Sequence, residues 1–285
     1  MRAAVNVPAW VKDAVFYQIF PDRFANGDPS NDPAGAERWG APPKGNNFFG
    51  GDLQGIMDHT GHLQRLGVNA LYLNPIFEAT SNHKYNTKDY LRFDPSFGTN
   101  ALFDRFSSHV REVGFRLVLD GVFNHVGTAF APFEDVVKNG DRSPYASWFN
   151  IFSWPVKGPR EPNYECWWGY GSLPKLMAQH PEVKEYLLSV AKQWTPKIDG
   201  WRLDVANEVP HEFWKEFRTA VRGWNPECYI VGELWEDASP WLQGDEFDAT
   251  MNYRFRAACL EFFTKDAIDA AGFDAHLTST RALYS

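Results

Sequence analysis

The sequence has few cysteines, no excess of positive charge and no long apolar run. Its three cysteines, Cys166, Cys228 and Cys259, are widely spaced and odd in number, which argues against a disulfide framework or a cysteine-based zinc site. A formal net charge of -8 disfavours a nucleic-acid partner, which would require a basic face. No stretch approaches a membrane span, and the opening residues lack the apolar core of a signal peptide. Unless a leader has been removed, we expect a cytoplasmic protein without nucleic-acid or membrane partners.

Short runs of strand-like composition recur along the chain and alternate with helical patterns. The predicted strands are residues 15–20, 69–75, 115–124, 199–206, 227–235 and 248–253, and the predicted helices are 52–67, 101–114, 181–194 and 211–224. This alternation predicts an α/β fold built from βα units around a parallel sheet. No glycine-rich phosphate-binding run follows any strand, which disfavours a Rossmann or P-loop fold.

Polar residues gather where the predicted strands end: Asp120, Asn124, Asp204 and Glu233. A (β/α)8 barrel of the TIM type places its active site at that end of its strands. Asp204 and Glu233 are 29 residues apart, close to one βα repeat. We therefore expect both carboxylates on adjacent strands, at one level of a common rim.

The alternation of predicted strands and helices is interrupted once, between Asn124 and Pro181, by a segment rich in Pro, Gly, Trp and Tyr. A loop that long inside a compact domain is usually functional. We predict a small inserted subdomain over residues 126–179, after the third barrel strand. Residues 1–125 would form the first part of the barrel, and residues 180–285 its continuation.

The segment GWRLDVANE, residues 200–208, places two charges inside a buried strand. Arg202 and Asp204 are two residues apart and so point to the same face. Arg202 would keep Asp204 ionised, whereas the apolar neighbours of Glu233 would tend to keep that carboxyl protonated. One ionised and one protonated carboxyl group is what a retaining glycosidase needs. A purely structural ion pair capping the barrel is the alternative, and spacing alone leaves both open.

Several longer motifs resemble a known family. DGVFNH (120–125), GWRLDVANE (200–208) and GELWE (232–236) resemble the first three signature regions of the α-amylase family of glycoside hydrolases, in order and spacing. LPKL (173–176) is similar to the MPKL of the neopullulanase, cyclomaltodextrinase and maltogenic amylase subgroup, with one substitution. VANEVPHEFW and FPDRFANGDPSNDP point to the same subgroup.

This resemblance implies a retaining hydrolase that cleaves maltooligosaccharides, cyclodextrins or pullulan through a covalent glycosyl-enzyme intermediate. Two alternatives stay open: a transglycosylase of the same family, and an inactive fragment that binds an α-glucan oligosaccharide without turnover. Product analysis at high sugar concentration would separate hydrolysis from transglycosylation.

Roles for individual residues follow from the resemblance. It implies Asp204 as nucleophile, Glu233 as general acid and base, and Arg202 as the partner of Asp204. Tyr85 would stack on the scissile glucose, and His125 would bind its hydroxyl groups. Three further residues have lesser implied roles: Asn124 shapes the end of the third strand, Asp120 is structural at the site, and His83 either lines the pocket or packs beside Tyr85.

The stretch NGDPSND, residues 26–32, gathers acids and amides in one turn. Its spacing is wrong for an EF-hand, and the same residue types suit any surface turn, so the residues alone favour a plain turn. The resemblance instead implies a structural Ca²⁺ held by oxygen ligands from this stretch and from a later Gly-x-Asp. The implied ligand residues are Asn26, Asp28, Asn31, Asp32, Gly50 and Asp52.

The predicted strands number six, whereas the barrel has eight. The fourth signature of the family, on the seventh strand, has no counterpart after Tyr253. We therefore expect an incomplete barrel of about six βα units with two open edges, which invite pairing with another chain. A complementary C-terminal polypeptide, self-association or an open sheet that folds alone would each fit, and the first two are favoured.

Overall fold

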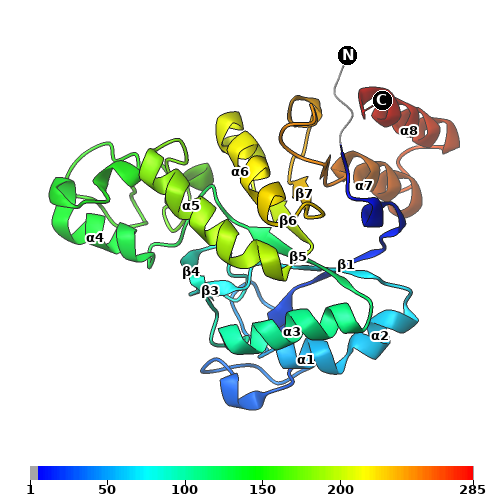
Figure 1. Cartoon of the computed structure of the whole chain (residues 1–285), viewed down its shortest axis with the longest axis horizontal. Coiled ribbons are helices and arrows are strands. Elements are labelled where there is room, and N and C mark those ends of the chain that lie inside the picture. Colours follow the sequence, from blue (N-terminus) through cyan, green and yellow to red (C-terminus); the bar gives the residue numbers. More distant parts are fainter. Residues whose placement is uncertain (1–5, 285) are drawn as a thin grey trace.

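The computed structural model describes residues 6–284. Six parallel strands form one curled sheet in the order β1, β2, β5, β6, β7, β8. Their bounds are Phe16–Ile19, Ala70–Leu73, Arg116–Gly121, Gly200–Leu203, Tyr229–Gly232 and Ala249–Thr250. Each lies inside one predicted strand range, so the predicted parallel sheet is confirmed. With β1 and β8 at its edges, the sheet is an incomplete (β/α)8 barrel (Figure 1).

Helices flank the sheet (Figure 1), and large side chains are buried between the helices and the strands. These helices are α1 (Leu53–Asp58), α2 (Thr60–Arg65), α3 (Asn100–Glu112), α5 (Pro181–Trp194) and α6 (His211–Trp224). Trp194 on α5 and Trp214 on α6 are fully buried, as is Trp201 on β6. Strands β2, β6 and β7 are buried at each of their residues, and Arg202 on β6 is the one charged residue among them. The predicted helix over 52–67 is interrupted at His59 and forms two short helices instead.

An antiparallel hairpin that the sequence reading missed lies between β2 and α3. Its strands are β3 (Phe77–Ala79) and β4 (Thr87–Phe93). The loop that joins them contains His83 and Tyr85, so the hairpin holds two candidate site residues outside the main sheet. Lys84 between them has a positive φ of 63° and a buried ion pair with Asp94 at 2.8 Å, which fixes this loop.

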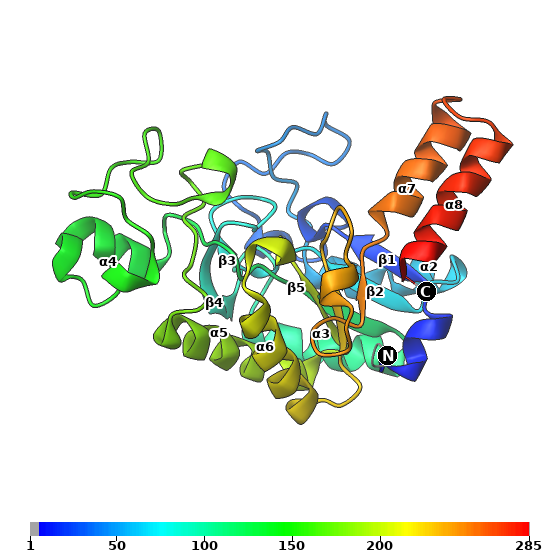
Figure 2. The same cartoon turned by 90° about the horizontal axis from the view of Figure 1, so that it is seen from above.

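The segment 126–179 contributes no strand to the main sheet. It contains α4 (Ala131–Asn139) and isolated bridges, and Figures 1 and 2 show α4 away from the strands. The bridge between His125 and Lys175 joins the end of β5 to the end of this segment. The division of the chain at 125 and 180 stays a prediction. Short 3-10 helices occupy Ala9–Asp13, Pro21–Arg23, Pro29–Asn31, Gly140–Arg142, Ala146–Trp148, Trp167–Gly169, Thr195–Lys197, Ala206–Glu208 and Ser239–Trp241.

The chain after β8 forms a helical hairpin that stands beside the sheet (Figure 2). It consists of α7 (Tyr253–Cys259), a π-helical turn (Leu260–Thr264) and α8 (Ala270–Tyr284), and α8 has no buried residue. Phe262 and Phe273 stack within the hairpin, and Tyr284 touches the loop after β7 through a hydrogen bond from the Ala238 amide. None of the helices within residues 6–284 has the length and apolar character needed to cross a membrane.

Candidate active site

The candidate catalytic residues meet at the carboxyl ends of β5, β6 and β7. In the parallel register Asp120 on β5 pairs with Arg202 on β6, and Arg202 pairs with Val231 on β7. Asp204 follows the last residue of β6, and Glu233 follows the last residue of β7. The expected placement of the two carboxylates on adjacent strands, at one level of the rim, is confirmed.

One guanidinium faces three buried carboxylates. Arg202 Nη1 lies 2.8 Å from Asp120 Oδ1 and 2.7 Å from Asp204 Oδ1, while its Nη2 lies 2.8 Å from Glu233 Oε1. All four side chains are nearly inaccessible to solvent. With every acid ionised the group would carry two uncompensated negative charges, which is costly away from water. The group therefore favours holding a proton among its members.

Burial and hydrogen bonding shift the pKa values of Asp204 and Glu233 in opposite directions. Burial raises the pKa of Asp204 well above its usual range, the charges of Asp120 and Glu233 add to this, and Arg202 only partly opposes it. Burial acts to raise the pKa of Glu233 as well, but Arg202 and several hydrogen-bond donors outweigh it, so the pKa of Glu233 is lowered. In the free site, both pKa shifts therefore run in the direction opposite to the expected one.

The physical reason for this correction lies in which atoms touch Glu233. Its sequence neighbours Val231 and Leu234 are apolar, but they do not set the environment of the carboxylate. The Val205 amide donates to Oε2 at 3.0 Å, and Trp235 Nε1 donates to Oε1 at 3.2 Å. Charged and polar donors favour the ionised form of a carboxyl group.

Asp120 is fully buried and holds neighbouring side chains of the site in place. Its Oδ2 accepts hydrogen bonds from the hydroxyls of Tyr72 at 2.5 Å and Tyr85 at 2.9 Å. Together with the ion pair to Arg202, these bonds use both carboxylate oxygens. Asp120 thereby fixes the Tyr85 ring, which lies 5.8 Å from the ring of His83 in a stacked arrangement. Tyr72, on β2, was not among the predicted residues.

A cleft of about 540 Å³ opens over this group of charges. His83, Tyr85, His125, Arg202, Asp204 and Glu233 line it, together with Trp167 and Trp235 and several smaller residues. Asn124 and Asp120 lie beneath it, fully buried, and do not line it. Six of the eight predicted catalytic and substrate-binding residues are thus brought to one cavity.

His125 is available to a ligand. Its Nε2 is buried without a hydrogen-bond partner among residues 6–284 and lies 4.0 Å from Asp204 Oδ2. Its Nδ1 lies 3.3 Å from the Asn124 side-chain amide, which orients the ring. Burial lowers the pKa of His125 to about 4, so the ring is neutral at neutral pH and can exchange hydrogen bonds with a sugar hydroxyl.

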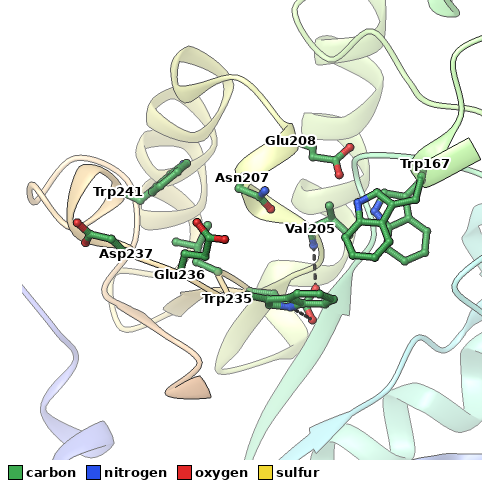
Figure 3. Close-up of a pocket in the computed structure, with 11 residues that line it drawn as sticks. Trp167, Val205, Asn207, Glu208, Trp235, Glu236, Asp237 and Trp241 are labelled. Carbon is green, nitrogen blue, oxygen red and sulfur yellow. Dashed lines mark hydrogen bonds between the residues drawn. The ribbon is translucent and has the colours of Figure 1, made fainter. Parts of the chain in front are cut away.

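A second cleft, of about 280 Å³, shares part of its lining with the first (Figure 3). Trp167, Val205, Glu233 and Trp235 line both clefts. In Figure 3, Trp167 and Trp241 lie on opposite sides of the second cleft. Glu233 therefore stands where the two clefts meet, with aromatic rings on either side. The tryptophan-rich composition was the only sequence signal for these rings.

Val205 links the two candidate catalytic residues through a strained backbone. Its φ of 45° lies in the left-handed region, which β-branched residues rarely adopt. This conformation directs the Val205 amide toward Glu233, immediately after Asp204 in the chain. Strain of this kind persists only where the surrounding structure enforces it, and it is concentrated at functional sites.

The loop with the predicted calcium ligands contains buried oxygen atoms and a close backbone contact. The Oδ1 atoms of Asn26 and Asn31 are buried without a partner among the described residues. Gly50 has a φ of 73°, and a Cβ there would lie 2.3 Å from Asp32 Oδ1, so only glycine lets this backbone approach. Unpaired buried amide oxygens beside a carboxylate suit a hard cation.

Asp52 makes several hydrogen bonds in this loop. Its carboxylate accepts hydrogen bonds from the amides of Gly27, Asp28 and Gly55 and from the Asn31 side chain, and it caps α1. Asp28 Oδ1 accepts from Ser30. No cluster of three His, Cys, Asp or Glu side chains suited to a metal occurs within residues 6–284. A cation here would therefore depend on amide and backbone oxygens as well as carboxylates.

Comparison with known proteins agrees with this geometry. The family model described as "Alpha amylase, catalytic domain" matches residues 18–283. Among curated proteins, a cyclomaltodextrinase of Bacillus sp is 53% identical over 281 residues, covering 97% of this chain and 50% of the relative. Neopullulanase 2 of Thermoactinomyces vulgaris is 52% identical over 283 residues, covering 98% of this chain and 48% of the relative. The chain thus spans about half the length of these relatives.

A solved structure shows the same fold. The cyclic alpha-maltosyl-(1→6)-maltose hydrolase from Arthrobacter globiformis superposes with a TM-score of 0.95 at 48% sequence identity, covering 98% of this chain and 63% of the other. The family match, the identities and the superposition extend over the strands and loops that build the site. The chain therefore belongs to the alpha-amylase family, within the catalytic domain of that family.

Proposed function

We propose that this chain carries the catalytic site of a retaining α-glucan hydrolase that acts on maltooligosaccharides, cyclodextrins or pullulan. The observation that carries the proposal is the placement of Asp204 and Glu233 on either side of Arg202, at the meeting point of two clefts. A glucan chain that runs through both clefts would bring one glycosidic bond to Glu233. The names of the cyclomaltodextrinase and neopullulanase relatives support this substrate class.

In the proposed reaction Glu233 protonates the glycosidic oxygen while Asp204 attacks the anomeric carbon and forms a glycosyl ester. The ionised Glu233 then takes a proton from water, which attacks the ester and releases the sugar with retained configuration. For the first step, the proton that the three buried acids share must reside on Glu233. A bound sugar that covers Glu233 would withdraw it from water and so raise its pKa, moving the proton from the Asp204 side to the acid.

Proton NMR of the first product tests the retaining mechanism. The α-anomer should form first during cleavage of an α-glucan and equilibrate afterwards. The β-anomer as first product would mean inversion and would refute the role of Asp204 as nucleophile.

A second activity, transglycosylation, is favoured by the aromatic lining of the second cleft. Trp168, Trp235 and Trp241 there present ring faces on which an acceptor sugar could stack. Longer oligosaccharides formed from maltotriose at high concentration would demonstrate it. Glucose and maltose alone, under the same conditions, would exclude it.

We also propose that further βα units, from a complementary C-terminal polypeptide or from a second copy of the chain, pair with the open sheet. A cavity of about 350 Å³ opens on the inner face of the curl, lined by Phe16, Tyr72, Val118, Tyr229 and Met251 among others. Phe16 on the edge strand β1 is 40% exposed. Native mass spectrometry of the purified chain should give a dimer or a complex with a second polypeptide, whereas a monodisperse active monomer would contradict the proposal.

A structural Ca²⁺ is proposed for the loop at residues 26–32. Asn26, Asn31, Asp32 and the Gly50 backbone offer oxygen atoms in this loop and the one beside it, and two of these atoms are buried without partners among the described residues. Bound there, the ion would join the loop after β1 to the loop before α1. Because Asp52 is occupied by four hydrogen bonds, it would support the loop rather than contact the ion.

We propose an intracellular location, supported by the name of a relative from Bacillus subtilis, "Intracellular maltogenic amylase", which is 52% identical over 269 residues. Cell fractionation tests it: the protein should remain with the cytoplasmic fraction, and recovery from the medium would contradict the proposal.

A further inference from the structure

Four donors converge on the Glu233 carboxylate. Its Oε1 lies 2.8 Å from Arg202 Nη2, 2.9 Å from the Tyr253 hydroxyl and 3.2 Å from Trp235 Nε1, and its Oε2 accepts from the Val205 amide at 3.0 Å. Guanidinium, indole and amide N–H groups can only donate, whereas a phenolic hydroxyl can also accept. Tyr253 is therefore the one group in this set whose hydrogen bond can reverse.

This difference matters for a carboxyl group that must exist in two forms. A carboxylate only accepts hydrogen bonds, while a protonated carboxyl group presents an O–H that needs an acceptor. The N–H donors around Glu233 all oppose that O–H. The Tyr253 oxygen can accept it if the tyrosine hydroxyl turns away, and Met251 Sδ, 3.9 Å from that oxygen, is an acceptor for the turned hydroxyl.

Tyr253 is held for this contact by elements outside the three signature motifs. It is the first residue of α7, directly after β8, and the Asn252 side chain caps this helix through the Phe255 amide. The Met251 amide donates to the Gly232 carbonyl at the end of β7, which ties the segment to the strand that precedes Glu233. The Tyr253 ring packs against Trp235 at 6.1 Å.

We propose that Tyr253 is a positioning residue for Glu233: its hydroxyl donates to the carboxylate in the free site and turns to accept from the carboxyl group once Glu233 is protonated. The functional part of this inference rests on the proposed role of Glu233 as general acid. The hydrogen bond to the carboxylate is charge-assisted and roughly twice as strong as the one to the neutral carboxyl. Tyr253 therefore favours the ionised form while leaving the acid form accessible.

Other charged groups facing Glu233 act alongside Tyr253 and must be held constant in a test. They are Arg202 and Asp204 from β6 and the segment after it, His125 from the end of β5, and Glu208, Glu236 and Asp237 across the second cleft. A Tyr253→Phe substitution removes none of these charges and keeps the ring, so a role in packing alone would leave the titration of Glu233 unchanged.

The test is a ¹³C NMR titration of the Glu233 side-chain carboxyl in the full chain labelled with [¹³Cδ]glutamate, assigned by the signal lost in Glu233→Gln. In Tyr253→Phe the pKa of Glu233 should rise by about half to one unit. In Tyr145→Phe, whose ring packs on Trp148 in the inserted segment, it should not change. A wild-type titration in Tyr253→Phe would overturn the proposal.

A second variant covers the case in which Tyr253→Phe does not fold. Placing 3-fluorotyrosine at position 253 keeps the shape and makes the hydroxyl a stronger donor, so the pKa of Glu233 should fall. No shift, or a rise, would overturn the proposal. The pH profile of kcat/KM separates this inference from the proposed function. If the NMR titration moves while the alkaline limb of hydrolysis stays fixed, Tyr253 acts on Glu233 but Glu233 is not the general acid.

Discussion

Arg202 Nη1 lies 2.7 Å from Asp204 Oδ1, yet this contact does not make Asp204 an ordinary ionised partner. The same guanidinium serves Asp120 and Glu233, so its charge is divided among three acids in a setting that excludes water. Replacing one member of such a group leaves buried charges without a partner. The resulting loss of folding stability is larger than the net stability that the intact ion pair contributes.

Arg202→Met should destabilise the protein by about 3–5 kcal/mol at pH 7, because three buried carboxylates lose the guanidinium that each of them contacts. Urea-induced unfolding at several pH values measures this. The variant raises the folded-state pKa of Asp120 and Asp204 further above their unfolded values, and it removes the cation that lowers the pKa of Glu233. Stability tied to such groups is present at low pH and lost as the pH rises, so the defect should be smaller near pH 4 than at pH 7.

The matched control for this prediction is Arg116→Met. Arg116 pairs with Asp199 at 3.0 Å, but its side chain is about half exposed. Removing an exposed partner typically costs about 1 kcal/mol or less. Equal losses in the two variants, or a pH-independent loss in Arg202→Met, would show that the three acids do not depend on Arg202.

Protonation of His125 should contribute to acid unfolding. Its pKa is lowered to about 4 by burial, below the ordinary value of 6.5. A group with a depressed folded pKa contributes stability that is present above the unfolded pKa and lost as the pH falls through the folded pKa. The loss should therefore develop between about pH 6.5 and pH 4 and reach roughly 3 kcal/mol.

A His125→Gln variant should flatten this part of the stability curve, measured by urea unfolding at each pH. His62→Gln, at an exposed position on α2, should leave the curve as in the wild type. A His125→Gln curve with the wild-type slope between pH 4 and 6.5 would assign the acid lability to other groups.

Val205→Gly should raise stability by about 1 kcal/mol, because glycine adopts a positive φ without the strain that a β-branched residue suffers. Activity should fall, since a looser backbone no longer directs the Val205 amide at Glu233. Thermal unfolding and initial rates measure the two effects. Val137→Gly, at an exposed position in α4, should instead lower stability. A destabilised Val205→Gly would refute the strain argument.

Calcium should stabilise the chelator-treated protein. A ligand at a hundredfold excess over its Kd adds about 2.7 kcal/mol, which corresponds to a rise in Tm of about 5 °C or more in a chain of this size. Differential scanning calorimetry with and without Ca²⁺ measures the shift. Mg²⁺ at the same concentration should have a smaller effect, because it requires near-octahedral geometry.

Asn31→Leu should abolish the calcium response, because it removes the amide oxygen while keeping a side chain of similar size. A Tm that does not move when calcium is added to the chelator-treated wild type would contradict the proposed ion. The unpartnered oxygens of Asn26 and Asn31 would then need another explanation.

Local patterns predicted the strands and the residues at their ends because each βα unit is marked by its own apolar run and turn residues. Asp204 and Glu233 could be placed together from spacing alone, since parallel strands end at one rim. The hairpin β3–β4 was missed because it stands outside this repeat. Its strands have only each other as partners in the described chain.

The protonation of the site could not be predicted in the same way. The groups that lower the pKa of Glu233 are Arg202, Val205, Trp235 and Tyr253, and all of them except Trp235 reach it from other segments of the chain. The burial that raises the pKa of Asp204 is a property of the assembled rim. Sequence neighbours indicate the composition near a residue, but the contacts that fix its charge are made across the fold.

The most direct measurement is the release of reducing sugar from β-cyclodextrin and maltotriose by this 285-residue chain, with Asp204→Asn and Glu233→Gln alongside. The account predicts release by the wild type and a loss of at least about a hundredfold in each variant, since each removes a group that acts in the transition state. Undiminished release in both variants, or saturable binding of maltotriose without any release by the wild type, would contradict it.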